Sequence, residues 1–369
     1  MTRGRAINLA PVLRVGYALA LAGALAWAAL IILASSQNGT LGYDYLAYDM
    51  AADRFLAGQP MYDPDAQSTG TFGLFFYPPP FAMLVVPFAI LPTDVAVWAW
   101  TIGLVVVSAA AIWLLPVSAR VRWIVLLLAA LSWPLVYAIK LGQVGPVLLL
   151  TFVVGWRWMD RPAALGVSTA LGAVIKIQPA LLIPWAVLTG RRRAAAVAVL
   201  VAGLLALAAT LVAGPQAWLD ELSLLGRVSR PVLTENALGF GRLAYEAGVS
   251  ESVATLIHWA NLALVLAVVA LVTRRGSAVA SYLAIVIASQ FATPVLWDHY
   301  ALVLLLPVAW LLQRGAWWAA VIPLVTATLL VGITPGVAYP ALFWVTLLAV
   351  AWFGLRDGRA ARVDGPFFA

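Results

Sequence analysis

The stretch GYDYLAYDMAADRFLAGQPMYDPDAQSTGTFGLFFYPPP (42–80) holds five of the 15 acidic residues in a chain of 369 residues. These five are Asp44, Asp49, Asp53, Asp63 and Asp65. One apolar segment precedes the stretch, and at least ten follow it. Carboxylates in so apolar a chain are expected where they can meet water beside a membrane. We therefore expect this stretch to carry the chemistry of the protein.

Composition decides the class of protein. Hydrophobic residues make up 64% of the chain and charged residues 10%, against roughly 25% charged residues in soluble domains. The sequence therefore predicts an all-α polytopic membrane protein with one integral domain, 1–369. There is no cysteine, which excludes disulfides and thiol catalysis. The two histidines, His258 and His299, are too few for a histidine-based metal cage, so we expect no metal and no cofactor.

About twelve apolar segments are predicted as transmembrane helices, the first an uncleaved span. The second is bracketed by prolines, which favours a tilted or re-entrant helix, and the sixth is interrupted at 176–179. Two long loops, 36–75 and 214–254, are predicted on the outer face. The predicted helices are 15–35, 76–91, 95–115, 122–139, 143–159, 163–188, 194–213, 255–272, 277–293, 299–313, 316–333 and 339–355.

Basic residues set the predicted orientation. With both termini in the cytoplasm and alternating spans, 13 of the 22 lysines and arginines fall inside, among them Lys140 and Arg191. Arginines 120, 122, 157 and 161 fall outside, together with most of the acids. Positive charge favours the cytoplasmic side. We expect a multi-pass protein of the cytoplasmic membrane whose active site lies on the extracytoplasmic face.

Asp44 is the leading catalytic candidate. It shares a helical face with Tyr48 and positions 51, 52 and 55, which predicts a short amphipathic helix on the membrane surface. Its carboxylate would lie at the level of lipid headgroups. Alternatively, Asp44 only caps this helix. Asp49 and Asp53 are interpreted as solvated or Arg54-paired charges.

Three further polar residues interrupt apolar sequence. Tyr77 precedes three prolines and either binds a sugar or phosphate or anchors the chain at the interface. Gln143 sits in LGQVGP (141–146), either as a ligand or as part of a tight turn. Lys176 lies deep in an apolar helix and should face the protein interior, a cavity or an anion, unless it snorkels to the cytoplasmic surface.

The segment WDHY (297–300) brings an imidazole to the mouth of a predicted helix. His299 would donate to a phosphate oxygen, and Trp297 would stack on a sugar. Alternatively, His299 is only an interfacial residue at the start of a helix. His258 is interpreted as structural. Asn236, in a glycine-containing part of the loop 214–254, is a candidate for a lid over the site.

The order of these motifs resembles a known family. It runs Asp44, G-x-x-x-Y-D (58–63), Y-P-P-P (77–80), L-G-Q (141–143), K-x-Q-P (176–179), Asn236 and P-x-x-W-x-H-Y (294–300). Over about residues 40–310 the chain is similar to glycosyltransferase family 87, the bacterial polyprenyl-phosphate-mannose-dependent mannosyltransferases of the C-type glycosyltransferase fold.

The resemblance implies an inverting enzyme that moves a hexose, typically mannose, from a polyprenyl-phosphate carrier to a glycolipid or envelope-glycan acceptor. Asp44 matches the family's aspartate base, and His299 matches the histidine that contacts the donor phosphate. Asp298 departs from the expected pattern by adding negative charge there. The residues fit this chemistry, since a carboxylate must take the acceptor proton and cations such as Lys176 must stabilise the leaving phosphate.

Other classes fit less well. A secondary transporter or a lipid or glycolipid flippase would show internal repeats and ionisable residues near the midplane, yet Lys176 alone is expected there. Nucleic-acid binding is disfavoured because the basic residues are scattered over short loops. A non-catalytic assembly subunit, or a sugar carrier other than mannose, remains open.

Overall fold

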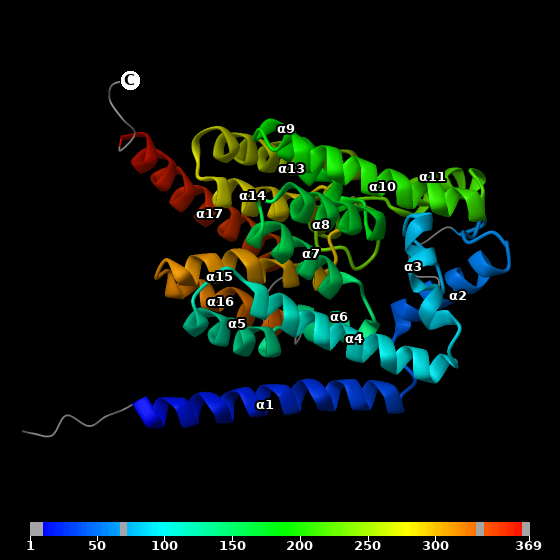
Figure 1. The fold of residues 1–369 in the computed structure, drawn as a ribbon, viewed down its shortest axis with the longest axis horizontal. Coiled ribbons are helices and arrows are strands. Elements are labelled where there is room, and N and C mark those ends of the chain that lie inside the picture. Colours follow the sequence, from blue (N-terminus) through cyan, green and yellow to red (C-terminus); the bar gives the residue numbers. More distant parts are fainter. Residues whose placement is uncertain (1–9, 67–71, 330–335, 364–369) are drawn as a thin grey trace, which may run out of the picture.

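A computed structural model describes residues 10–66, 72–329 and 336–363. Within these ranges the chain is helical, without strands, as the composition predicts. Parts of the predicted loop 36–75 and helix 316–333 lie outside the described residues. Figure 1 shows the long helices running roughly side by side, with the short helices of residues 43–56 and 79–89 at one end.

Five described helices are long and apolar enough to cross a membrane. They are α1 (Ala10–Gln37), α4 (Thr93–Leu114), α10 (Arg192–Ala213), α13 (Glu251–Arg275) and α17 (Ala338–Val363). A sixth crossing is the pair α5 (Ala119–Leu131) and α6 (Trp133–Leu141), which is bent by 61° where a single helix 122–139 was predicted. The prediction of about twelve full-length spans is therefore not confirmed.

Shorter apolar helices make up most of the rest. They are α3 (Pro79–Ala89), α7 (Gly145–Arg157), α8 (Pro162–Ile175), α9 (Leu182–Leu188), α14 (Ala278–Phe291), α15 (Leu305–Gln313) and α16 (Val321–Leu329), with 3₁₀ turns η1 (Gln178–Leu181), η2 (Asp298–Leu304) and η3 (Trp317–Ala320). Three helices fall in the predicted loops, namely α2 (Tyr43–Leu56), α11 (Gln216–Val228) and α12 (Phe240–Glu246). The predicted break of the sixth helix is confirmed, because η1 separates α8 from α9.

The centre of the molecule is formed by helices that are buried on every side. Residues 280–291 of α14 and 305–312 of α15 are all buried. A helix that is apolar all round is stable only when protein or lipid surrounds it. The turn η2 joins this core to the outer helices, because it packs against α6, α7, α14, α16 and α17.

The predicted sidedness of several loops is wrong. The backbone amide of Gly42 donates to the Lys140 carbonyl at 2.9 Å, so Lys140 lies at the end of the molecule that carries α2. Arg191 pairs with Asp160 at 3.1 Å, so their two loops share the other end. The prediction had placed Lys140 and Arg191 on the cytoplasmic side, and Gly42 and Asp160 on the outer side.

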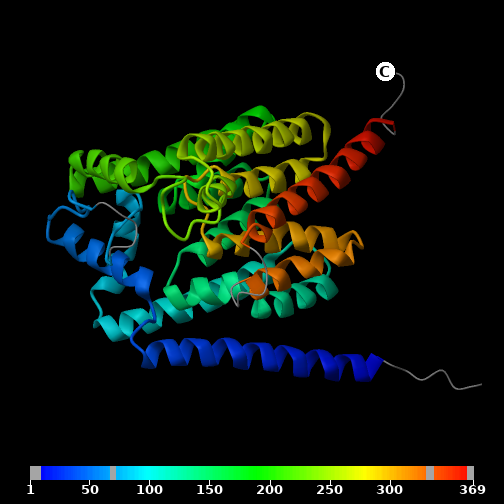
Figure 2. The same ribbon diagram turned by 180° about the vertical axis from the view of Figure 1, so that it is seen from behind.

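Helix α3 is the cause of this error. Its 11 residues span roughly 16 Å, which is too short to cross a membrane core of about 30 Å. α3 stays at the α2 end, and the broken pair α8–α9 later turns back before crossing (Figures 1 and 2). In the corrected topology, the start of α5 and the turn from the end of α7 to α8 lie at the end opposite α2, where α1 begins and α17 ends. These segments carry arginines 120, 122, 157 and 161.

Candidate active site

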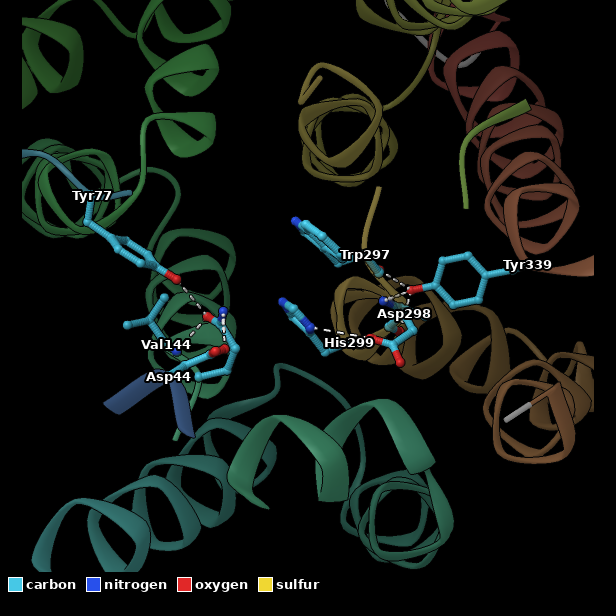
Figure 3. Close-up of polar contacts among 9 residues, drawn as sticks. Asp44, Tyr77, Val144, Trp297, Asp298, His299 and Tyr339 are labelled. Carbon is cyan, nitrogen blue, oxygen red and sulfur yellow. Dashed lines mark hydrogen bonds and ion pairs between the residues drawn. The ribbon is translucent and has the colours of Figure 1, made fainter. Parts of the chain in front are cut away.

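Asp44 lies in the first turn of α2, and its surroundings explain why the helix begins there. Gly42 precedes the helix with φ 75°, a left-handed conformation that favours glycine. No side chain caps the helix, so Asp44 is not the cap considered above. Its Oδ2 instead accepts a hydrogen bond from Gln143 Nε2 at 2.8 Å (Figure 3).

The remaining acids of α2 have different surroundings. Asp53 is exposed, as predicted. Asp49 is buried and accepts a hydrogen bond from the Tyr45 hydroxyl at 3.0 Å, so its interpretation as a solvated charge is wrong. α2 packs against α3 instead of lying alone on a membrane surface. Helix packing, which the local pattern does not reveal, decides which of these carboxylates is covered.

Gln143 is surrounded by hydrogen-bond donors. Its Oε1 accepts from the backbone amide of Val144 at 2.9 Å and from the Tyr77 hydroxyl at 3.1 Å. The Tyr77 hydroxyl also meets that of Tyr48 at 2.8 Å. All three side chains are buried, so Tyr77 supports Gln143 and is not an interfacial anchor, and Tyr48 supports Tyr77.

His299 lies on η2, opposite Asp44. The Tyr339 hydroxyl contacts the carbonyls of Trp297 and Asp298 and accepts from the amide of Ala301, which holds this turn in place. The imidazole Nδ1 lies 3.4 Å from Asp298 Oδ1, so Asp298 orients the ring. In Figure 3 the rings of Trp297 and His299 project towards the side of the site where Asp44 and Tyr77 lie.

Lys176 follows α8, which ends at Ile175 because the chain becomes extended before Pro179. The Lys176 ammonium lies 4.3 Å from the centre of the Tyr300 ring and 5.7 Å from that of Tyr77. These cation–π contacts hold the charge beside the site, so Lys176 does not snorkel to the opposite surface.

A cavity joins these elements. Its polar wall consists of Gln143, Lys176, Gln178, Gln290, His299 and Tyr300. Within the described part of the chain, His299 Nε2 and Gln178 Nε2 are buried without a hydrogen-bond partner. The sequence analysis missed Gln178 and Gln290. The K-x-Q-P motif contains Gln178, and a second polar side chain beside a buried lysine was the available signal.

The electrostatics of Asp44 follow from burial and nearby charges. Burial raises the pKa of the Asp44 carboxyl above its ordinary value. His299, the Gln143 hydrogen bond and Lys176 each lower the pKa, and Asp298 raises it further. Burial dominates, so this carboxyl is a better proton acceptor than an exposed aspartate.

Two candidates lie away from the cavity. Asn236 is exposed, with a positive φ of 60°, and does not line the cavity. His258 is buried in α13 beside Gly241, in keeping with a structural role. No group of three or more His, Asp or Glu suited to a metal ion occurs among the described residues; that the protein needs no metal stays a prediction.

Comparison with known proteins gives one match. The model of glycosyltransferase family 87 matches residues 75–297, more than half of the chain. The matched segment contains Tyr77, Gln143, Lys176 and Trp297, while Asp44 lies 31 residues before it and His299 two residues after it. No curated protein and no solved structure matches the chain.

Proposed function

Because this chain belongs to glycosyltransferase family 87, we propose that it transfers mannose from a polyprenyl-phosphate-mannose donor to a glycolipid or glycan acceptor. The reaction takes place on the extracytoplasmic face of a bacterial cytoplasmic membrane. It inverts the anomeric configuration, and Asp44 is the general base. The lipid-phosphate sugar is a substrate, and no cofactor takes part.

One observation carries this proposal, namely that Asp44 is hydrogen-bonded to Gln143, which lines a cavity whose wall holds buried polar atoms without a partner in the described part of the chain. His299 Nε2 and Gln178 Nε2 are buried in the cavity wall without a partner among the described residues. A buried donor that lacks a partner costs about 1–3 kcal/mol. An anion would accept a hydrogen bond from Gln178 Nε2. It would also accept one from His299 Nε2 in the imidazolium form of the ring, because Nδ1 faces the Asp298 carboxylate. The Lys176 charge beside them favours an anion further.

The chemistry follows from this arrangement. The acceptor hydroxyl loses its proton to Asp44 as its oxygen bonds to the anomeric carbon. The bond from that carbon to the phosphate oxygen breaks, and its electron pair leaves with the lipid phosphate. His299, Gln178 and Lys176 stabilise the charge of the leaving group. Trp297, which is half-buried and projects towards the side of the site where Asp44 lies, provides an apolar ring for the sugar.

The corrected topology supports the proposed side of the membrane. The start of α5 and the turn from the end of α7 to α8 lie at the same end as Arg191 and the end of α17. These segments carry arginines 120, 122, 157 and 161. Basic residues accumulate on the cytoplasmic side. The end with Asp44 is then extracytoplasmic, and the first and last helices begin and end in the cytoplasm.

The test is transfer of radiolabelled mannose from polyprenyl-phosphate-mannose by the full-length protein in liposomes, with lipid extract of the source cell as acceptor. We expect Asp44→Asn to lower the rate by about 10²–10⁴-fold, the usual contribution of a general base. Asp49→Asn is the matched control on the same helix and should retain wild-type transfer.

Transfer that survives Asp44→Asn would remove Asp44 from the base role. If arabinose or glucose carriers support transfer and mannose does not, the proposed sugar is wrong. If none of the carriers is used, lipid scrambling is measured in the same liposomes. Scrambling by the protein would then support the transporter or flippase alternative.

A further inference from the structure

We infer that Gln143 is a positioning residue which, held by Tyr77 and the Val144 amide, turns one oxygen of the Asp44 carboxylate towards the acceptor. This inference rests on the proposed role of Asp44 as general base. It adds a residue of the cavity wall that acts through its hydrogen bond to Asp44.

The orientation of the Gln143 amide follows from its neighbours. A backbone N–H can only donate, so the side-chain atom 2.9 Å from the Val144 nitrogen must be the oxygen Oε1. The Tyr77 hydroxyl donates to the same Oε1 at 3.1 Å, which occupies its second lone pair. The Nε2 group therefore points away from both donors and meets Asp44 Oδ2 at 2.8 Å.

The backbone around Gln143 restricts the side chain as well. Gly142 adopts φ 74°, and its carbonyl accepts a hydrogen bond from Trp100 Nε1 at 2.8 Å. A Cβ at position 142 would lie 2.6 Å from Tyr45 Cβ, so the turn packs directly on α2. The L-G-Q segment and the helix that carries Asp44 are therefore in direct contact.

The two oxygens of the Asp44 carboxylate therefore have different functions. Oδ2 is held by Gln143, which leaves Oδ1 to accept the proton of the acceptor hydroxyl. The donated hydrogen bond also favours the ionised carboxylate and so offsets part of the effect of burial on its pKa. The other groups that act on Asp44 or respond to its charge are His299 and Asp298 on η2, Lys176 after α8, Tyr48 on α2, Tyr77 before α3 and Tyr137 on α6.

The test is the pH dependence of kcat/KM for mannose transfer, which reports groups of the free enzyme. Gln143→Met keeps the length of the side chain but donates no hydrogen bond. We expect kcat/KM to fall by about tenfold or more. The acid limb of the profile, where kcat/KM rises with pH as Asp44 ionises, should move to higher pH. The direction follows because Asp44 acts as the carboxylate, and removal of a donor raises the pH at which it ionises.

A second variant keeps the test open if Gln143→Met does not fold. Tyr77→Phe frees Oε1 from one donor and should displace the acid limb in the same direction by a smaller amount. Tyr62→Phe is the matched control, because the Tyr62 hydroxyl donates to the Tyr77 carbonyl at 2.7 Å and does not touch Gln143. It should leave the acid limb in place.

The outcomes separate this inference from the proposed function. A displaced limb in Gln143→Met or Tyr77→Phe, with Tyr62→Phe unchanged, supports the positioning role. Slower transfer with an unmoved limb in both variants would show a structural role only and overturn it. If Asp44→Asn retains full transfer, Asp44 is not the base. The proposed function of Asp44 and the positioning role of Gln143 are then both wrong.

Discussion

The hydroxyl of Tyr339 accepts a hydrogen bond from the backbone amide of Ala301 at 2.8 Å, across 38 positions of sequence. The same hydroxyl lies 2.7 Å from the Trp297 carbonyl, to which it can donate. Tyr339 is fully buried at the start of α17. One side chain therefore bonds to the backbone on both sides of His299.

Loss of this hydroxyl should loosen the turn. We expect Tyr339→Phe to fold but to raise KM for the donor by about fivefold, since a typical hydrogen bond contributes about 1 kcal/mol. The acid limb of kcat/KM should stay where it is, because Asp44 is held by another part of the chain. Steady-state kinetics with donor and acceptor varied separately measure both effects. An unchanged donor KM would contradict this role of Tyr339.

The two nitrogens that are buried in the cavity wall without a partner among the residues described, His299 Nε2 and Gln178 Nε2, should bind the phosphate of the lipid-linked sugar. His299→Ala and Gln178→Leu should each raise KM for the lipid-phosphate sugar by about 10–100-fold, because hydrogen bonds to charged groups contribute about 1.5–3 kcal/mol. Competition by polyprenyl phosphate without sugar should weaken in parallel. Gln313→Leu is the control, since Gln313 binds the Ser118 amide at the opposite end of the molecule. If polyprenyl phosphate inhibits Gln178→Leu and wild type equally, the proposal that Gln178 binds the anion is wrong.

Glu221 predicts pH-dependent stability. Burial raises the pKa of this carboxyl to about 7 from an ordinary value of 4.5. Because the folded protein favours the protonated form of Glu221, the contribution of this proton to stability is complete below pH 4.5. It is lost as pH rises through 7. At pH 8, Glu221→Gln should therefore be more stable than wild type, by on the order of 2 kcal/mol.

This difference should disappear towards pH 4.5. Thermal unfolding of the detergent-solubilised protein at both pH values checks it. A constant difference at the two pH values would show that ionisation of Glu221 is not the cause. Because Arg227 ties the same helix, α11, to the carbonyls of Asp63 and Ala66, the effect should also appear as faster proteolysis of the loop 57–66 at pH 8 in wild type.

Gly142 predicts a packing effect. Gly142→Ala meets two costs, a left-handed φ of 74° and a Cβ only 2.6 Å from Tyr45 Cβ. The first costs roughly 1–2 kcal/mol, and the second forces α2 away from the turn. Gly190→Ala has a similar φ of 79° with nothing within 4 Å of its Cβ, so it isolates the first cost. Unfolding measurements should show the larger loss at position 142, and transfer should fall only there.

Local features explain which parts of the site could be predicted from the sequence. An aspartate, a lysine and a histidine in apolar surroundings are costly to bury, so Asp44, Lys176 and His299 stand out in a single sequence. The helix around Asp44 and the break before Pro179 depend on neighbouring residues as well. The structure brings all three side chains together with Gln143, although their assigned roles in transfer still await experiment.

Other features depend on contacts between distant segments. Gln178 and Gln290 look like ordinary polar residues until the cavity wall is seen, and Asp49 is buried because α2 packs in the protein. The failure of α3 to cross the membrane changed the side of several later loops, since each assignment by alternation depends on the one before it.

The sequence by itself determined that this is a helical membrane protein, because too few of its residues are polar to cover a soluble surface. It also determined which rare polar side chains had to be accounted for. Only the tertiary structure decided that Gln143 Nε2 meets Asp44 across 99 positions and which side chains share a cavity. Such a contact depends on the packing of α2 against the turn at 142, and no local period in the chain encodes it.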